Sequence, residues 1–101
     1  MTVVALVGDL MDRSKLSLAI PDITFARDVA GCAGASVVVV DIARYGALVA
    51  TLRESDPSAR IIGFGSHVDE VGAEQARGDG ADVVLPRSRF FRDPAAAVAG
   101  A

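Results

Sequence analysis

The 101-residue chain is poor in several residue types that often define a protein class. It has one cysteine, Cys32, so neither an internal disulfide nor a cysteine-only metal cage can form. It has no tryptophan and only 5% aromatic residues, although hydrophobic residues make up 51% of the chain. Alanine, with 18 residues, and valine, with 14, supply most of its hydrophobic residues, which favours β-branched strands packed closely against alanine-lined helices. This apolar content also excludes an intrinsically disordered chain.

The chain also lacks a large excess of either charge and any long apolar run. Ten basic and thirteen acidic residues give a net charge of -3 at pH 7, which provides no basic field for unspecific nucleic-acid binding. No apolar run approaches the roughly 18 residues that cross a bilayer. Charged residues from Asp9 onward come too early for a signal peptide. We therefore expect one soluble, cytoplasmic domain over residues 1–101, with no nucleic-acid or membrane partner.

The order of apolar segments predicts alternating strands and helices. Short β-branched segments predict buried strands at residues 3–7, 36–40, 60–64 and 82–85, with a weaker strand at 22–26. Helical spacing and end signals predict helices at residues 11–20, 45–54 and 69–78, and a last one that begins near Arg89 or Asp93. Pro94 fits the first turn of this last helix if Asp93 is its N-cap. Residues 27–35 contain two glycines and leave room for two helical turns at most. This pattern predicts a parallel sheet covered on both faces, with a shortened second helix.

Ligands of an open α/β sheet bind beyond the carboxyl ends of its strands. Two carboxylates, a hydroxyl and a cation follow the predicted strands. The residues concerned are Gly8, Asp9, Asp41, Gly65, Ser66, His67 and Arg87, with Asp12 a little after Asp9. We expect these residues to meet at one end of the sheet.

The stretches VVALVGDL, ASVVVVDIARYG, ARIIGFGS and GADVVLPRSRF resemble the receiver domain of two-component response regulators over nearly the whole chain. The resemblance implies a flavodoxin-like (CheY-like) three-layer α/β/α sandwich with strand order 2-1-3-4-5. It places the family's acidic pair at Gly8 and Asp9, its phosphoacceptor at Asp41, its switch hydroxyl at Gly65 and its lysine at Arg87. Mg²⁺ would be held by Asp9 and Asp41.

Several of these positions depart from the family pattern. Gly65 has no hydroxyl to bond a phosphoryl group, and Ser66 replaces it only if side-chain alternation lapses at the strand end. Glycine at position 8 weakens a Mg²⁺ site without abolishing it. Arg87 keeps the positive charge but differs from an ammonium in reach and geometry, and Ser88 stands where the family commonly has proline. We therefore expect a pseudo-receiver that regulates a protein partner in trans, without conventional phosphorelay.

Other interpretations stay open. A genuine receiver would take a phosphoryl group on Asp41, with Mg²⁺ held by Asp9 and Asp41. A flavodoxin-like module would instead bind a nucleotide or another small anion at the same strand ends, and the two aspartates could also simply cap loops or helices. Enzymatic turnover is not expected, because His67 and Cys32 alone do not assemble a nucleophile, a base and an orienting partner.

The resemblance also implies a partner surface on the fourth helix, the fifth strand and the fifth helix. We predict that Arg89, Phe90 and Arg92 contact a protein partner or a second copy of the chain there. Alternatively, one phenylalanine of this segment packs inward while the arginines are solvated. Cys32 is more typical of a buried structural thiol than of a nucleophile, and His67 of an exposed surface residue than of a base.

Overall fold

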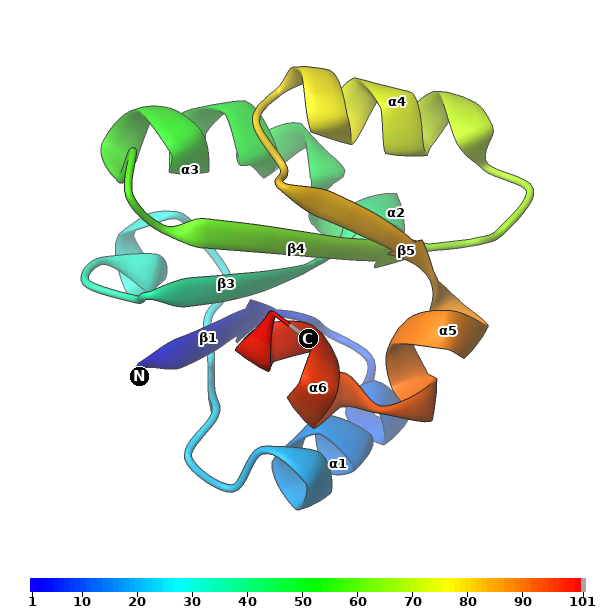
Figure 1. Ribbon diagram of the computed structural model, residues 1–101. Helices are drawn as coiled ribbons and strands as arrows, with labels where there is room; N and C mark the ends of the chain where they lie inside the picture. The colour runs from blue at the N-terminus through cyan, green and yellow to red at the C-terminus, as the bar shows by residue number, and fades with distance from the viewer. Residues whose placement is uncertain (101) are drawn as a thin grey trace.

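The computed structural model describes residues 1–100, which fold around a five-stranded parallel sheet (Figure 1). The strands are β1 (Val3–Leu6), β2 (Thr24–Phe25), β3 (Val37–Asp41), β4 (Arg60–Gly65) and β5 (Val83–Pro86). Their hydrogen-bonded order is β2-β1-β3-β4-β5, and every neighbouring pair is parallel. The structure therefore confirms the predicted fold class and strand order.

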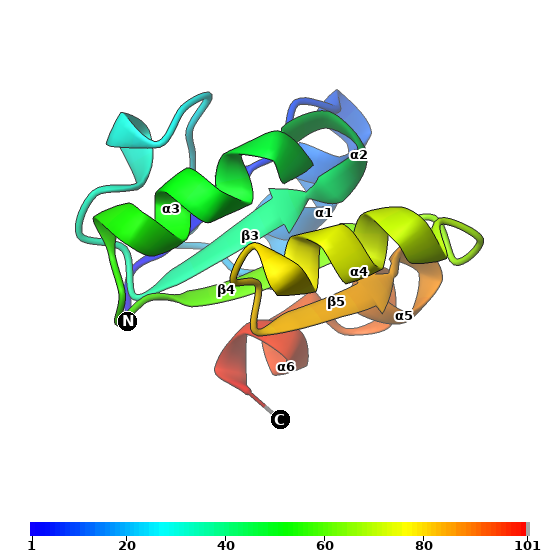
Figure 2. The ribbon, with the colours of Figure 1, turned by 90° about the horizontal axis from the view of Figure 1, so that it is seen from above.

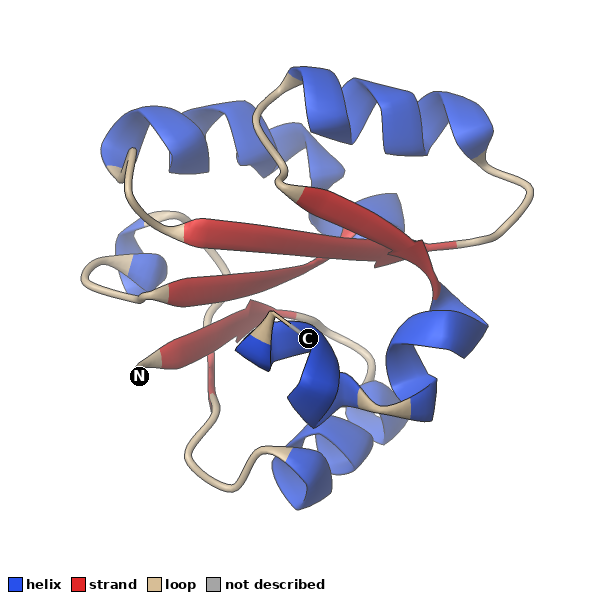
Figure 3. Cartoon of the chain, in the orientation of Figure 1, coloured by secondary structure: helices blue, strands red, loops and turns tan. Residues whose placement is uncertain are grey.

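Helices cover both faces of the sheet, which makes three layers (Figure 3). One face carries η1 (Ala30–Cys32), α2 (Ile42–Tyr45), η2 (Gly46–Leu48), α3 (Val49–Ser55) and α4 (Glu70–Gly78). The other carries α1 (Leu10–Ala19), α5 (Arg87–Arg92) and α6 (Pro94–Ala99). The short second helix is confirmed as the single 3₁₀ turn η1.

Two predicted helices are each divided in the structure. The helix predicted at 45–54 begins earlier, at Ile42, and passes through a 3₁₀ turn at Gly46, where glycine weakens the α-helix. The last helix breaks at Asp93, whose side chain accepts a 3.1 Å hydrogen bond from the Ala96 amide and begins α6. Pro94 occupies the first turn of α6 and Asp93 caps it, as the sequence predicts.

The core forms two layers because side chains alternate along each strand. Val38 and Val40 of β3 pack beneath α3 and α4, whereas Val37 and Val39 pack toward α1 and α5. Both layers are buried, which explains why the central strands appear in the sequence as continuous apolar runs. None of the helices within residues 1–100 has the length and apolarity needed to span a membrane.

Arg53 of α3 binds together the loops at the amino end of the sheet. Its guanidinium donates to the carbonyls of Gly80, Asp56, Pro57 and Ala59 and, at 2.8 Å, to the carboxylate of Asp82. The same Asp82 oxygen accepts a 2.8 Å hydrogen bond from the Ile61 amide of β4. Gly80 has a φ of 117°, a conformation that favours glycine. The α3–β4 and α4–β5 loops are thus held by one side chain.

Candidate functional site

Four of the predicted positions lie at the carboxyl end of the sheet. Asp9 precedes α1, Asp41 ends β3, Gly65 ends β4 and Arg87 begins α5 directly after β5. Figure 2 shows α2 continuing from the carboxyl end of β3, on the side where the β4–α4 loop and α5 also begin. The parallel sheet therefore brings these positions to one end, where ligands of open α/β folds bind.

An ion pair between Asp12 and Arg87 connects α1 to the start of α5. Nη1 and Nη2 of Arg87 donate to the two carboxylate oxygens of Asp12 at 3.1 and 2.7 Å. Such bidentate geometry makes an arginine–carboxylate contact strong and well oriented. Asp12 is only 3% exposed, whereas the Arg87 side chain is 44% exposed. The pair is therefore buried on the aspartate side and open to solvent on the arginine side.

Aromatic rings support the guanidinium of Arg87. Its Cζ atom lies 5.3 Å from the ring centroid of Phe64 and 5.2 Å from that of Phe91, within cation–π range. The hydrogen bonds that Arg87 donates to Asp12 raise the pKa of Arg87, while partial burial opposes the effect. The guanidinium is therefore held in place as a permanent cation.

The sequence places Asp12 shortly after β1 without predicting a role for it, although one signal for such a role exists. Asp12 lies four residues before Leu16, and both are buried on the inner side of α1. A carboxylate on the apolar side of a helix needs a buried partner, because an unpaired charge there is costly. The helical period could therefore have singled out Asp12, but it could not have named a partner 75 residues away.

Arg44 occupies the space beside Gly8. A Cβ atom at Gly8 would lie 2.8 Å from Nη1 and 3.0 Å from Cζ of Arg44. The Cζ of Arg44 also lies 5.6 Å from the ring centroid of Tyr45. A guanidinium thus stands where the resemblance to receivers would place the side chain of a second acidic residue.

The two candidate metal ligands have different surroundings. Asp9 caps α1, since its carboxylate accepts a 2.9 Å hydrogen bond from the Asp12 amide. Asp41 is half-buried at the start of α2, where its carboxylate faces the main-chain amides of Ala43 and Arg44. Burial raises the pKa of the Asp41 carboxyl, and the nearby Ala43 amide and the charge of Arg87 partly offset that rise. The capping interpretation therefore applies to Asp9 through a direct hydrogen bond, and the Asp41 carboxylate also lies beside the first-turn amides of its helix.

These residues fit a divalent cation poorly. Within residues 1–100, no group of three or more histidine, cysteine, aspartate or glutamate side chains is arranged to hold a metal ion. One oxygen of Asp9 is used by the cap, both oxygens of Asp12 are used by Arg87, and the guanidinium of Arg44 lies against Gly8. The guanidinium groups of Arg44 and Arg87 therefore already lie beside the carboxylates that would have to bind a Mg²⁺ ion.

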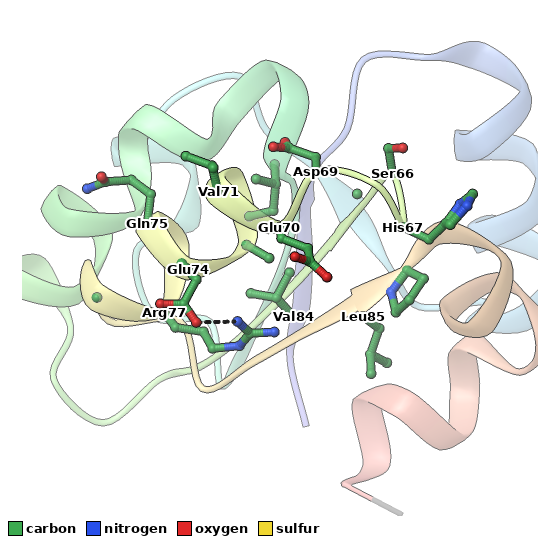
Figure 4. A pocket seen from close by; sticks show the side chains of 15 residues that line it. Ser66, His67, Asp69, Glu70, Val71, Glu74, Gln75, Arg77, Val84 and Leu85 are labelled. Atoms are coloured by element: carbon green, nitrogen blue, oxygen red, sulfur yellow. Dashed lines mark ion pairs between the residues drawn. The ribbon is translucent and has the colours of Figure 1, made fainter.

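Position 65 has room for a side chain, but the residue there is glycine and therefore carries no hydroxyl. A Cβ atom at Gly65 would have its nearest neighbour, Cβ of Ile42, at 3.7 Å, an ordinary van der Waals distance. The hydroxyl of the exposed Ser66 accepts a 3.4 Å hydrogen bond from the Val68 amide within the following turn. Figure 4 shows the Ser66 side chain directed away from the Val84 side of β5. The Ser66 hydroxyl therefore bonds the main chain of its own loop and does not replace the missing hydroxyl at position 65.

The structure corrects one predicted partner contact. Phe90 is fully buried and stacks on Phe64 at 5.0 Å between ring centroids, so it is a core residue and offers no surface to a partner. It faces inward because α5 begins at Arg87 and turns Phe90 toward the sheet, while Arg89 and Arg92 remain exposed. This outcome matches the alternative in which one phenylalanine packs inward.

Cys32 and His67 lie where the sequence predicts, one as a buried thiol and the other as an exposed surface residue. Cys32 is buried, its thiol donates to the Asp28 carbonyl at 3.6 Å, and burial raises its pKa to about 11. A thiol of this kind is a poor nucleophile. His67 is exposed in the β4–α4 loop.

Comparisons with known proteins agree at the level of the fold. No protein-family model matches the sequence, and no curated protein matches it either. The crystal structure of a response regulator protein from Burkholderia pseudomallei, with a phosphorylated aspartic acid, a calcium ion and citrate, matches with a TM-score of 0.81 and 19% sequence identity. The match covers 96% of this chain, which spans 65% of that one.

The signal receiver domain of a DNA-binding response regulator from Colwellia psychrerythraea 34H has the same architecture. It matches with a TM-score of 0.64 and 11% identity, over 91% of this chain and 94% of that one. At these identities the likeness establishes the fold. The chain has the receiver fold of response regulators.

Proposed function

We propose that the chain is a pseudo-receiver, a regulatory module that acts on a protein partner in trans and does not run a Mg²⁺-dependent phosphorelay. The observation that carries the proposal is the Asp12–Arg87 pair. The cation that follows β5 already binds a buried carboxylate of its own chain. A phosphoryl group on Asp41 would have to compete with that carboxylate for Arg87.

The charges around Asp41 support the same proposal. Asp9, Asp12 and Asp41 are accompanied at this end of the sheet by the guanidinium groups of Arg44 and Arg87. The two guanidinium charges offset two of the three carboxylate charges, which weakens the attraction of this site for a divalent cation. Gly65 also provides no hydroxyl that could bind a phosphoryl oxygen.

The proposal can be tested by nuclear magnetic resonance on the ¹⁵N-labelled chain. The protein is titrated with Mg²⁺ and then with beryllofluoride, a phosphoryl mimic. We expect the amide signals around Asp41 and Arg87 to stay in place. Saturable shifts of these signals would overturn the pseudo-receiver assignment.

A rebuilt site makes the negative result informative. The variant Gly8→Asp/Gly65→Thr/Arg87→Lys returns an acid, a hydroxyl and an ammonium to their receiver positions. The backbone leaves room for a side chain at Gly65, and the flexible Arg44 side chain can move from Gly8. We expect this variant to respond to Mg²⁺ and beryllofluoride. The matched variant with Gly8→Asn in place of Gly8→Asp isolates the contribution of the added charge.

A genuine receiver is the second candidate, and the phosphorylated aspartic acid and calcium ion of the Burkholderia structure favour it. Asp41 would then accept the phosphoryl group, and Asp9 and Asp41 would bind Mg²⁺. Incubation with acetyl phosphate and Mg²⁺, followed by intact-protein mass spectrometry, distinguishes the two candidates. The addition of one phosphoryl group, absent in Asp41→Asn, would establish the second.

The proposed module would act in the cytoplasm and without enzymatic turnover. Its partner would be another protein or a second copy of the chain, bound over α4, β5 and α5. Arg89 and Arg92 are the exposed predicted contacts on α5.

A further inference from the structure

A groove of about 930 Å³ runs between α4 and β5 (Figure 4). β5 is the last strand of the sheet, and all four of its residues are only half-buried. Val84, Leu85 and Pro86 contribute an apolar lining together with Ile42 of α2. A volume of this size is in the range that binds ligands. The groove therefore leaves apolar surface of the strand incompletely covered.

An exposed valine extends this apolar surface onto the opposite wall. Val71, in the first turn of α4, lines the groove and is 82% exposed. An exposed apolar side chain that borders an apolar hollow enlarges the surface on which a partner can bury apolar groups.

The charge of the groove is predominantly negative. Its lining includes the carboxylates of Asp69, Glu70 and Glu74 and a single guanidinium, that of Arg77. Arg77 lies 3.8 Å from Glu74 in an exposed pair, the kind of contact that contributes little to stability. Figure 4 shows Glu70 and Glu74 on the side of α4 that faces Val84. The apolar floor is thus bordered by carboxylates that a cationic group can reach.

One end of the groove meets the carboxyl end of the sheet. Ile42, which directly follows Asp41, lines it together with Gly65 and Ser66. An occupant of the groove would therefore contact the segments that follow β3 and β4.

We infer that the groove binds an extended segment of a partner protein in which apolar side chains are flanked by lysine or arginine. The inference rests on the proposed function and names the chemistry of the partner. Apolar side chains fill the space over Val84 and Leu85, and the cations meet Glu70 and Glu74, which gives complementary charge across the interface. An acidic segment is repelled from this groove and would be drawn to Arg89 and Arg92 instead.

Three acetylated octapeptides test the inference by titration of the ¹⁵N-labelled protein. One alternates leucine with lysine, the second leucine with glutamate, and the third serine with lysine. We expect the leucine–lysine peptide to shift the amides of Glu70, Glu74 and Val84 and to bind more weakly as salt is added. The other two peptides should bind at least tenfold more weakly. Equal binding of the leucine–glutamate peptide, or shifts confined to α5, would overturn the inference.

Charge reversal provides the matched variants. Glu70→Lys/Glu74→Lys should weaken binding of the leucine–lysine peptide about tenfold, because two attractive charge contacts become repulsive. Asp22→Lys/Glu54→Lys reverses two exposed acids outside the groove and should leave the affinity for this peptide unchanged. Val71→Ser, at a site too exposed to affect folding, should weaken binding about threefold. Equal effects of the two double variants would refute the groove as the binding site.

Sedimentation of the protein alone separates this partner from a second copy of the chain. A concentration-dependent dimer that Glu70→Lys/Glu74→Lys abolishes would assign the groove to self-association and overturn the inference. The peptide experiment contains neither Mg²⁺ nor a phosphoryl mimic. Its failure is therefore distinguishable from failure of the proposed function.

Discussion

An arginine–aspartate ion pair lies at each end of the sheet, but the two arginines have different numbers and kinds of partners. At the amino end, Arg53 donates six hydrogen bonds, five of them to main-chain carbonyls and one to Asp82. At the carboxyl end, Arg87 donates two hydrogen bonds, both to Asp12. The side chain of Arg53 is 23% exposed, about half the exposed fraction of Arg87.

The comparison separates a structural contact from an exchangeable one. Arg53 satisfies main-chain groups of two loops at once, so losing any one contact leaves the others in place. Arg87 has one partner and a solvent-exposed guanidinium that a competing anion can reach. The carboxyl end, which carries the candidate site, is therefore the end at which the structure can change at lower cost.

The largest effect is expected from Arg53→Ala. The substitution leaves several loop carbonyls and Asp82 without their donor, and should lower the free energy of unfolding by about 3 kcal/mol. Urea denaturation followed by circular dichroism measures the loss. Arg89→Ala, which removes an exposed arginine, should change stability by less than about 0.5 kcal/mol. A similar small loss for Arg53→Ala would remove the distinction between the two ends.

A smaller loss, about 2 kcal/mol, is expected from Arg87→Ala, because Asp12 is then buried without its partner. The value is set below that of a fully buried pair since Arg87 is partly exposed. The variant Asp12→Leu/Arg87→Met should recover most of the stability, because it removes both charges together. Additive effects of Asp12→Leu and Arg87→Met in a double-mutant cycle would contradict a direct pair.

Asp41→Asn should stabilise the protein slightly at neutral pH. Burial raises the pKa of the Asp41 carboxyl above 3.8, so the folded state binds its proton more tightly than the unfolded state. The ionised carboxylate therefore opposes folding above the raised pKa. The benefit of the asparagine should disappear below pH 3.8, where the wild-type carboxyl is protonated in both states. Urea titrations at pH 7 and near pH 3 check this sign, and destabilisation at pH 7 would contradict it.

Cys32 offers a probe of local opening with little effect on stability. Its thiol is buried, with a pKa of about 11, so very little thiolate is present at pH 8. We expect native protein to react with a disulfide reagent far more slowly than unfolded protein. Arg53→Ala should accelerate labelling more than Arg87→Ala does. The reverse order would show that Cys32 responds to the carboxyl end of the sheet.

The sequence predicts the fold well because the relevant signals are local. Continuous apolar runs indicated strands buried on both faces, and the two glycines of residues 27–35 limited the second helix to the turn now seen as η1. Helix boundaries were less accurate, as at residues 45–54, where the helix begins at Ile42 and Gly46 interrupts it with a 3₁₀ turn. Asp93 and Pro94 were predictable because capping depends on immediate neighbours.

The site was predictable only in part. Parallel strands place Asp9, Asp41, Gly65 and Arg87 at one end of the sheet whatever their side chains do. The hydrogen bonds of Asp12 and the position of Arg44 depend on how α1, α2 and α5 pack. The inward turn of Phe90 depends on the register at which α5 starts.

By itself, the sequence determined the order of strands and helices, the short second helix and the absence of a hydroxyl at position 65, because these depend on local pattern and residue identity. Only the packing of distant segments could show that Arg87 binds Asp12, that Arg44 fills the space beside Gly8, and that a groove with an acidic border lies between α4 and β5. These contacts join residues far apart in the chain. Their free energy becomes available only after the sheet has brought the segments together.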